Sequence, residues 1–172
     1  MEHEYVRHGA LALLAGLDVH TGQVFASTPK TTGIAPFMEL AGQVMARPEY
    51  KNAARVFVVV DNGSDHRGQA AIDRLRTAHP NAIMIHTPVH ASWLNQIEIF
   101  FSIVQKKVVS PNDFPSLDKL SETLLAFVDR YNQTAAPFNW KYTGADLKAL
   151  LSRISEHDKQ DARRQTGLAQ AA

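Results

Sequence analysis

Two acidic residues of the sequence occupy positions where a carboxylate could hold a metal ion. Asp61 follows a β-branched run, Arg55 to Val60 (RVFVVV), which predicts a central strand. Functional groups in open α/β sheets gather at the carboxyl ends of strands. Glu98 lies in a segment of helical periodicity. Carboxylate oxygens suit Mg²⁺ or Mn²⁺, and two such ions about 3.5–4 Å apart can bind both the attacking and the leaving oxygen of a phosphodiester displacement.

Each acid also has an ordinary structural interpretation. Asp61 begins Asp-Asn-Gly-Ser, a sequence that forms a turn by itself, with the aspartate as an Asx-turn or helix-cap residue. Glu98 belongs to a polar strip that is typical of a solvated helix face, made of Asn95, Glu98, Ser102 and Gln105. The segment before this helix, His90 to Asn95 (HASWLN), favours a functional role, because it places a tryptophan and several hydrogen-bonding groups directly before the acid.

Four further residues near the acids are candidates for contacts with a nucleic acid. His66 could touch a phosphate or a bound water molecule, or could simply be a polar residue at the start of a helix. Trp93 could stack on a base or pack beneath the site. Lys106 and Lys107 could contact phosphates, or they could complement the C-terminal dipole of their helix.

The elements that must position these residues alternate between strands and helices. Continuous β-branched or apolar runs predict strands, and apolar residues at spacings of three and four predict helices. We expect strands over Gly9–Val19, Val24–Ser27, Arg55–Val60 and Ala82–His86. We expect a first helix that begins at Thr31 or Thr32 and ends before Pro48. Further helices are expected over about Asp65–Ala78, Ile97–Val108, Leu117–Tyr131 (capped by Ser116) and Ala145–Ile154. The first strand should be buried on both faces. A hairpin followed by crossovers that favour parallel pairing predicts an α/β layer fold with a mixed sheet.

Composition sets outer bounds on the class of protein. The 172 residues suffice for one domain with a hydrophobic core, and hydrophobic (45%) and charged (20%) fractions are ordinary for a globular chain. The absence of cysteine excludes disulfides and thiolate metal sites, and no apolar run reaches the length of a membrane span. The net charge of +1 provides no strong overall field, so DNA binding would depend on local basic patches.

Four stretches of the chain resemble the DDE transposases of the mariner-like superfamily, in its bacterial insertion-sequence branch. They are HGALALLAGLDVHTGQV (8–24), VFVVVDNGSDH (56–66), HTPVHASWLNQIEIFFSIVQKKVVSPNDF (86–114) and YNQTAAPFNWKYTG (131–144). The most specific signals are the Asp61-Asn62 pair after a strand and the SWLNQIE motif that begins a helix. Asn62 and Asn95, which lie in these motifs, are therefore accessory candidates.

The resemblance implies an RNase H-like fold, a mixed central sheet flanked by helices, and three acidic residues that bind two Mg²⁺ or Mn²⁺ ions for DNA cleavage and strand transfer. Asp61 matches the family's second acid and Glu98 its third. The first acid lies on a strand upstream of the segment that matches His8 to Val24, so we expect this chain to lack that strand and the DNA-binding helix-turn-helix region. Asp18 is assigned to the hairpin turn, and Glu2 and Glu4 to a terminus that frays.

The sequence thus predicts an N-terminally truncated catalytic core over residues 1–156 and a polar, disordered tail over 157–172. The intact protein would cleave and transfer DNA, whereas this chain alone is expected to be inactive. The alternative is a catalytically dead remnant that acts as a DNA- or partner-binding scaffold. The expected partners are double-stranded DNA (element ends and target) and a second copy or an upstream transposase fragment, with no membrane and no small-molecule substrate. The expected location is the bacterial cytoplasm, near the nucleoid.

Overall fold

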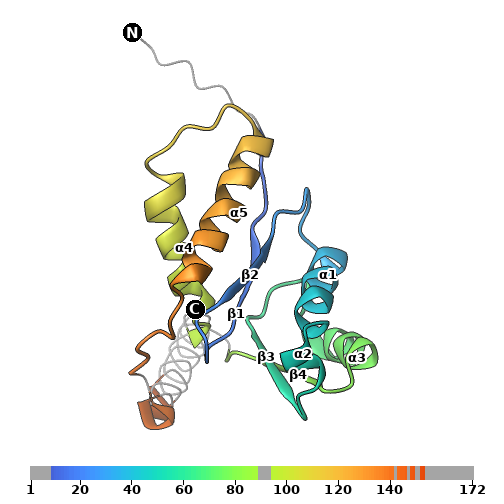
Figure 1. Cartoon of the computed structure of the whole chain (residues 1–172). Helices are drawn as coiled ribbons and strands as arrows, with labels where there is room; N and C mark the ends of the chain where they lie inside the picture. The colour runs from blue at the N-terminus through green and yellow to red at the C-terminus, as the bar shows by residue number, and fades with distance from the viewer. Residues whose placement is uncertain (1–8, 89–93, 142, 147, 150–151, 154–172) are drawn as a thin grey trace, which may run out of the picture. The chain divides into compact units, whose positions relative to one another are not determined.

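The computed structural model describes residues 9–88, 94–141, 143–146, 148–149 and 152–153 (Figure 1). Backbone packing divides the chain into two units, residues 1–138 and 139–172. In the second unit, residues 144–146, 148–149 and 152–153 are helical, and the rest of the helix expected over Ala145–Ile154 lies outside the described residues. The predicted tail over 157–172 lies outside them too. No helix among the described residues is long and apolar enough to cross a membrane.

The first strands form an antiparallel hairpin, β1 (Leu14–Leu17) with β2 (Val24–Ser27). The turn between them is closed by two backbone hydrogen bonds, from Asp18 N to Gln23 O (2.9 Å) and from Gly22 N to Asp18 O (2.7 Å). The predicted bounds of β2 are confirmed. The prediction of a long first strand buried on both faces is wrong, because β1 pairs over four residues only and all four are half-buried.

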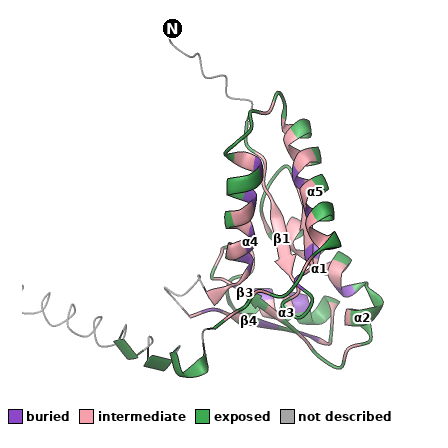
Figure 2. Ribbon diagram, turned by 60° about the vertical axis from the view of Figure 1, so that its left-hand side comes forward, coloured by how far each residue is buried: buried purple, intermediate pink, exposed green. Residues whose placement is uncertain are grey.

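A helical pair covers this hairpin. Helix α4 (Ile97–Val104) continues into a π-helix, η2 (Gln105–Val109), and α5 (Leu117–Gln133) lies beside them. Their shared core with Val24 contains the fully buried Phe100, whose ring meets that of Tyr131 at 5.1 Å. Figure 2 shows the buried parts of α4 and α5 on the sides that face each other and β1. Ser116 caps α5 as predicted, because its side chain accepts from Lys119 N.

A second group of elements surrounds a parallel pair, β3 (Val56–Val60) and β4 (Ala82–His86). Helices α1 (Ile34–Met45), α2 (Pro48–Lys51) and α3 (Gly68–Ala78) gather around it (Figure 1). Their core consists of Met45, Val60, Ala71, Leu75, Ala82 and Met84.

Two predicted helix starts in this group are wrong. Helix α1 has Gly33 at its N-cap with no side-chain cap, so neither Thr31 nor Thr32 caps it. Helix α3 begins at Gly68 rather than near Asp65, because residues 64–66 form a turn first. Within α3, Ala71 and Leu75 are buried, whereas Ala78 is exposed.

The described strands form two separate two-stranded sheets rather than one mixed sheet. The chain is thus a mixed α/β structure with small sheets, and β3 is not a central strand among the described residues, since it pairs with β4 alone. One face of the parallel pair is exposed and apolar, through Phe57 (59%), Val59 (49%), Ile83 (38%) and Ile85 (43%). Helix α1 packs on both sheets: it contacts β1 and β2, and its Met45 lies in the core beneath β3 and β4.

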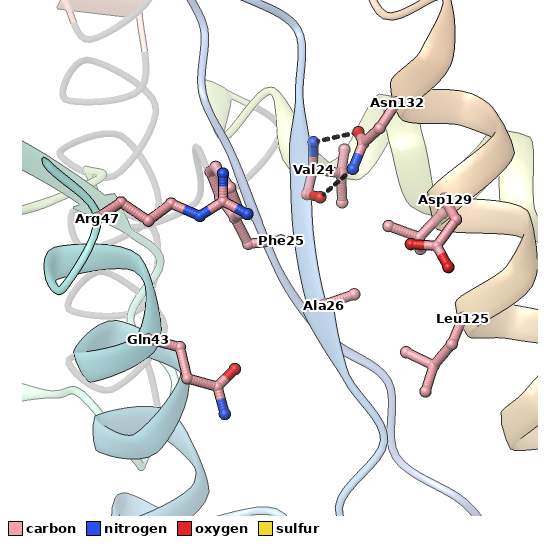
Figure 3. A pocket seen from close by; sticks show the side chains of 9 residues that line it. Val24, Phe25, Ala26, Gln43, Arg47, Leu125, Asp129 and Asn132 are labelled. Carbon is pink, nitrogen blue, oxygen red and sulfur yellow. Dashed lines mark hydrogen bonds between the residues drawn. The ribbon is translucent and has the colours of Figure 1, made fainter. Parts of the chain in front are cut away.

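At the start of β2, a side chain of α5 bonds the edge that faces away from β1. The amide group of Asn132 bonds both backbone groups of Val24, accepting from its N at 2.8 Å and donating to its O at 2.8 Å (Figure 3). A pocket of about 290 Å³ lies beside this edge, between residues of α5 on one side and, on the other, Gln43 of α1 and Arg47, the N-cap of α2. None of the predicted site residues lines this pocket.

Candidate functional site

The loops that follow β3 and β4 are joined to one another at the carboxyl end of the parallel sheet. Val60 pairs with His86 at the end of the register, and Thr87 N donates to Val60 O at 2.8 Å. The side-chain amide of Asn62 then donates to Thr87 O at 2.9 Å. These bonds fix the chain on both sides of Asp61, as expected for a functional residue at a strand end.

Asp61 uses one carboxylate oxygen for local structure. Its Oδ1 accepts from the backbone N of Gly63 (3.0 Å), an Asx-turn bond, and from Nε2 of His66 (2.6 Å). Within the described residues, Oδ2 makes no hydrogen bond, and 39% of the side chain is exposed. The turn interpretation and the ligand interpretation are therefore compatible, because the turn leaves one oxygen open to solvent.

Hydrogen bonding lowers the pKa of Asp61 below its ordinary value. The bond from His66 contributes most, burial opposes the shift, and the Gly63 amide adds to it. The carboxylate is consequently ionised at neutral pH, as a ligand for a hard cation must be.

His66 contacts the acid itself, which the sequence did not predict. Its ring lies against that of Phe37, with centroids 5.2 Å apart, and its backbone O accepts from Nε2 of His86 at 2.6 Å. The position of His86 near this site could have been predicted from the sequence. In a parallel pair, the residue that ends β4 lies beside the residue that ends β3, which directly precedes Asp61. A phosphate contact by His66 stays a prediction.

Glu98 lies in the first turn of α4, where the helix dipole favours a negative charge. Its side chain is exposed, and its backbone N donates to Asn95 O at 3.1 Å. Ser102 and Gln105 are exposed on the same polar strip, as the sequence predicts. This environment suits either a solvated face or a metal ligand, and the pairing of Glu98 with Asp61 stays a prediction.

The remaining candidates differ in their surroundings. Trp93 lies outside the described residues. Asn62 is exposed but donates to Thr87 O, which gives it a structural task. Lys106 and Lys107 are both exposed in η2, whose single π-turn ends with a bond from Ser110 N to Gln105 O at 2.8 Å. Single π-turns occur frequently at functional sites.

In the described part of the chain, no group of three or more His, Asp or Glu residues could hold a metal ion. Asp18 is a turn residue, as predicted: its Oδ1 accepts from His20 N at 2.8 Å and its Oδ2 from the Tyr50 hydroxyl at 2.7 Å. Both of its oxygens are thus engaged. Glu2 and Glu4 lie outside the described residues.

Comparison with known proteins adds one match. A family model described as DDE superfamily endonuclease matches residues 2–121. The matched stretch contains Asp61 and Glu98 together with β1 to β4 and α4. No curated protein and no solved structure matches the chain.

Proposed function

Since the chain belongs to the DDE superfamily endonucleases, we propose that it is part of a DNA transposase catalytic core, with Asp61 and Glu98 as two of its metal ligands. One observation carries the proposal: a single family match spans both acids, and the structure places them where a strand ends and where a helix begins. The Asp61-Asn62 pair and the SWLNQIE motif support the mariner-like, bacterial insertion-sequence branch, and with it a site of action in the cytoplasm near the nucleoid.

The residues present fit a divalent metal ion in part. Oδ2 of Asp61 is open, Glu98 is exposed, and both supply the oxygen ligands that Mg²⁺ and Mn²⁺ prefer. The described residues contain no group of three or more His, Asp or Glu residues that could hold a metal ion. Two carboxylates should hold a hard cation loosely, so we propose a partial site that needs one more acid for catalysis.

Each residue of this site has a defined task in the proposed reaction. Bound ions would supply charge stabilisation in a phosphodiester displacement. Asp61 and Glu98 would hold these ions, and the loop bonds around Asn62 and Thr87 keep Asp61 in place. Lys106 and Lys107 contact DNA phosphates and so fix the position of the protein along the duplex. Phosphate contacts of this kind do not distinguish one DNA sequence from another.

We also propose that the two small sheets are halves of one RNase H-like sheet, in the order β2-β1-x-β3-β4. Helix α1 packs on both pairs, which supports their lying in one layer. Among the described residues, β1 pairs only with β2 and β3 only with β4, so each has an edge that a further strand could join. The position x would be taken by a strand outside the described residues, carrying the remaining acid.

A second candidate function is a binding scaffold without catalysis. The absence of a three-acid group in the described residues favours it. Such a scaffold would bind either DNA, through Lys106 and Lys107, or a transposase partner. Neither kind of binding would depend on Asp61. Asp61→Ala therefore separates the two functions.

The test is a cleavage assay on labelled double-stranded DNA with Mg²⁺ or Mn²⁺. We expect no cleavage by this chain alone, because small misplacements of reacting groups can cost about a hundredfold in rate. We expect cleavage when a second polypeptide carrying the family's first acidic strand is added, and its loss with Asp61→Ala. Cleavage by the chain alone that Asp61→Ala abolishes would refute the partial site. Restored cleavage that survives Asp61→Ala would refute the metal-ligand assignment.

A further inference from the structure

The hydrogen bond between His66 and Asp61 shows which ring nitrogen of the histidine carries a proton. An ionised carboxylate can only accept hydrogen bonds, so Nε2 of His66 must be the donor in the 2.6 Å contact with Oδ1. The backbone O of His66 likewise only accepts, so His86 must donate to it from its own Nε2. Nδ1 of His66 is buried and has no partner among the described residues, which favours an unprotonated nitrogen there over an unsatisfied donor.

The surroundings of His66 hold its ring in this position. Only 18% of the side chain is exposed, and the Phe37 ring packs against it. Gly63 leaves the space that the ring occupies: a Cβ at this residue would lie 3.0 Å from both Cε1 and Nε2 of His66 and 3.1 Å from Oδ1 of Asp61. Gly63 does not have a positive φ, so here the glycine serves close approach rather than turn geometry.

We propose that His66 is a positioning residue that engages Oδ1 of Asp61 and thereby reserves Oδ2, in one rotamer, for a divalent cation. The inference rests on the proposed function and deepens it. Without the histidine, the carboxylate would be held on Oδ1 by the Gly63 amide alone and could rotate. Outer-shell partners of metal ligands typically contribute about 10–100-fold in metal affinity.

The experiment measures Mn²⁺ affinity, from the spectrum of free Mn²⁺ in electron paramagnetic resonance, for the whole chain and four variants. His66→Ala removes the donor, His66→Gln keeps an N–H donor on a shorter reach, and Asp61→Ala removes the ligand. His20→Ala, which alters a side chain that is 91% exposed, is the matched control. We expect His66→Ala to bind at least about tenfold more weakly, His66→Gln to recover most of that loss, and His20→Ala to match the wild type.

A second readout needs neither metal nor a variant. Nitrogen chemical shifts of the His66 imidazole in the wild-type chain should show the proton on Nε2 and none on Nδ1; a proton on Nδ1 alone would overturn the inference even if His66→Ala fails to fold. Unchanged affinity in a folded His66→Ala, together with a loss in Asp61→Ala, would overturn it while leaving the proposed function intact. Unchanged affinity in Asp61→Ala would refute the proposed function, and the inference with it.

Discussion

The hydroxyl of Tyr50 donates a 2.7 Å hydrogen bond to Oδ2 of Asp18, and this bond ties helix α2 to the turn between β1 and β2. Burial by itself would raise the pKa of Asp18, but hydrogen bonds from Tyr50, His20 and Thr21 lower it below its ordinary value. Burial and the bond to Asp18 raise the pKa of Tyr50. Asp18 therefore stabilises the fold, and its engaged oxygens leave it poorly suited to replace a catalytic acid.

Replacing Tyr50 by Phe should destabilise the chain by about 1–3 kcal/mol at pH 7, because it removes a hydrogen bond to a charged group. The effect should shrink below pH about 4. The pKa of Asp18 is lower in the folded than in the unfolded chain, so its contribution is present above the unfolded value and is lost as the pH falls through the folded value. Urea unfolding at pH 7 and pH 3 measures both values.

Tyr131→Phe is the control for this prediction, because burial alone raises the pKa of Tyr131. Its effect on stability should not depend on pH between 3 and 7. A Tyr50→Phe effect that is the same at both pH values would show that the bond to Asp18 does not carry the stabilisation.

Replacing Gly63 by Ala should displace the His66 ring from Asp61, since the added Cβ would lie 3.0 Å from two ring atoms. We expect a loss of about 1–3 kcal/mol in unfolding free energy, which is the usual cost of overpacking, and weaker Mn²⁺ binding. Gly16→Ala is the matched control, because a Cβ there meets no atom within 4 Å. Equal effects of the two substitutions on Mn²⁺ binding would contradict the role of Gly63.

The exposed apolar face of the parallel pair should drive self-association at micromolar concentration. Phe57 lies opposite Ile83 and Val59 opposite Ile85 in the register, so the four exposed side chains form one continuous patch. The double substitution Val59→Thr and Ile85→Thr keeps β-branched residues while removing apolar surface, and it should lower the mean mass in sedimentation velocity. A wild-type chain that sediments as a stable monomer would show that the patch does not self-associate.

Lys106 and Lys107 should each contribute a phosphate contact to DNA binding. Replacing both by Ala should weaken binding about equally for unrelated sequences and reduce the slope of log affinity against log salt by about 2. Fluorescence anisotropy with labelled duplexes at several salt concentrations measures this slope. Lys51→Ala, which removes an exposed lysine of α2, provides the control and should leave the slope unchanged. An unchanged slope in the double variant would place DNA binding elsewhere.

Sequence patterns correctly predicted the helices and strands whose bounds are set by neighbouring residues in the chain. The β-branched and apolar runs gave β2 and β4 their observed bounds, and the Ser116 cap of α5 is confirmed by its bond to Lys119 N. Helix α3 was expected three residues too early, because residues 64–66 form a turn, with a bond from His66 N to Gly63 O, that helical periodicity does not reveal.

Predictions of strand partners succeeded for each pair but not for the sheet as a whole: the hairpin and the parallel pairing are confirmed, whereas the described strands form two sheets rather than one. A run such as Val56–Val60 indicates a strand but not how many neighbours it has, and among the described residues β3 pairs with β4 alone. For the candidate site, residue type and spacing singled out Asp61 and Glu98. The bond from His86 to His66 depends on the parallel register, which no single segment encodes, whereas the bond from His66 to Asp61 joins two residues of one loop.

The central claim is that Asp61 and Glu98 are ligands in one divalent-metal site. Its most direct test is Mn²⁺ titration, by calorimetry, of the wild type, Asp61→Ala, Glu98→Ala and, as control, Glu39→Ala, which removes an exposed carboxylate of α1. We predict that each of the first two substitutions weakens Mn²⁺ binding, that the double variant loses little more than either single one, and that Glu39→Ala binds as the wild type does. Wild-type affinity in both single variants would contradict the claim.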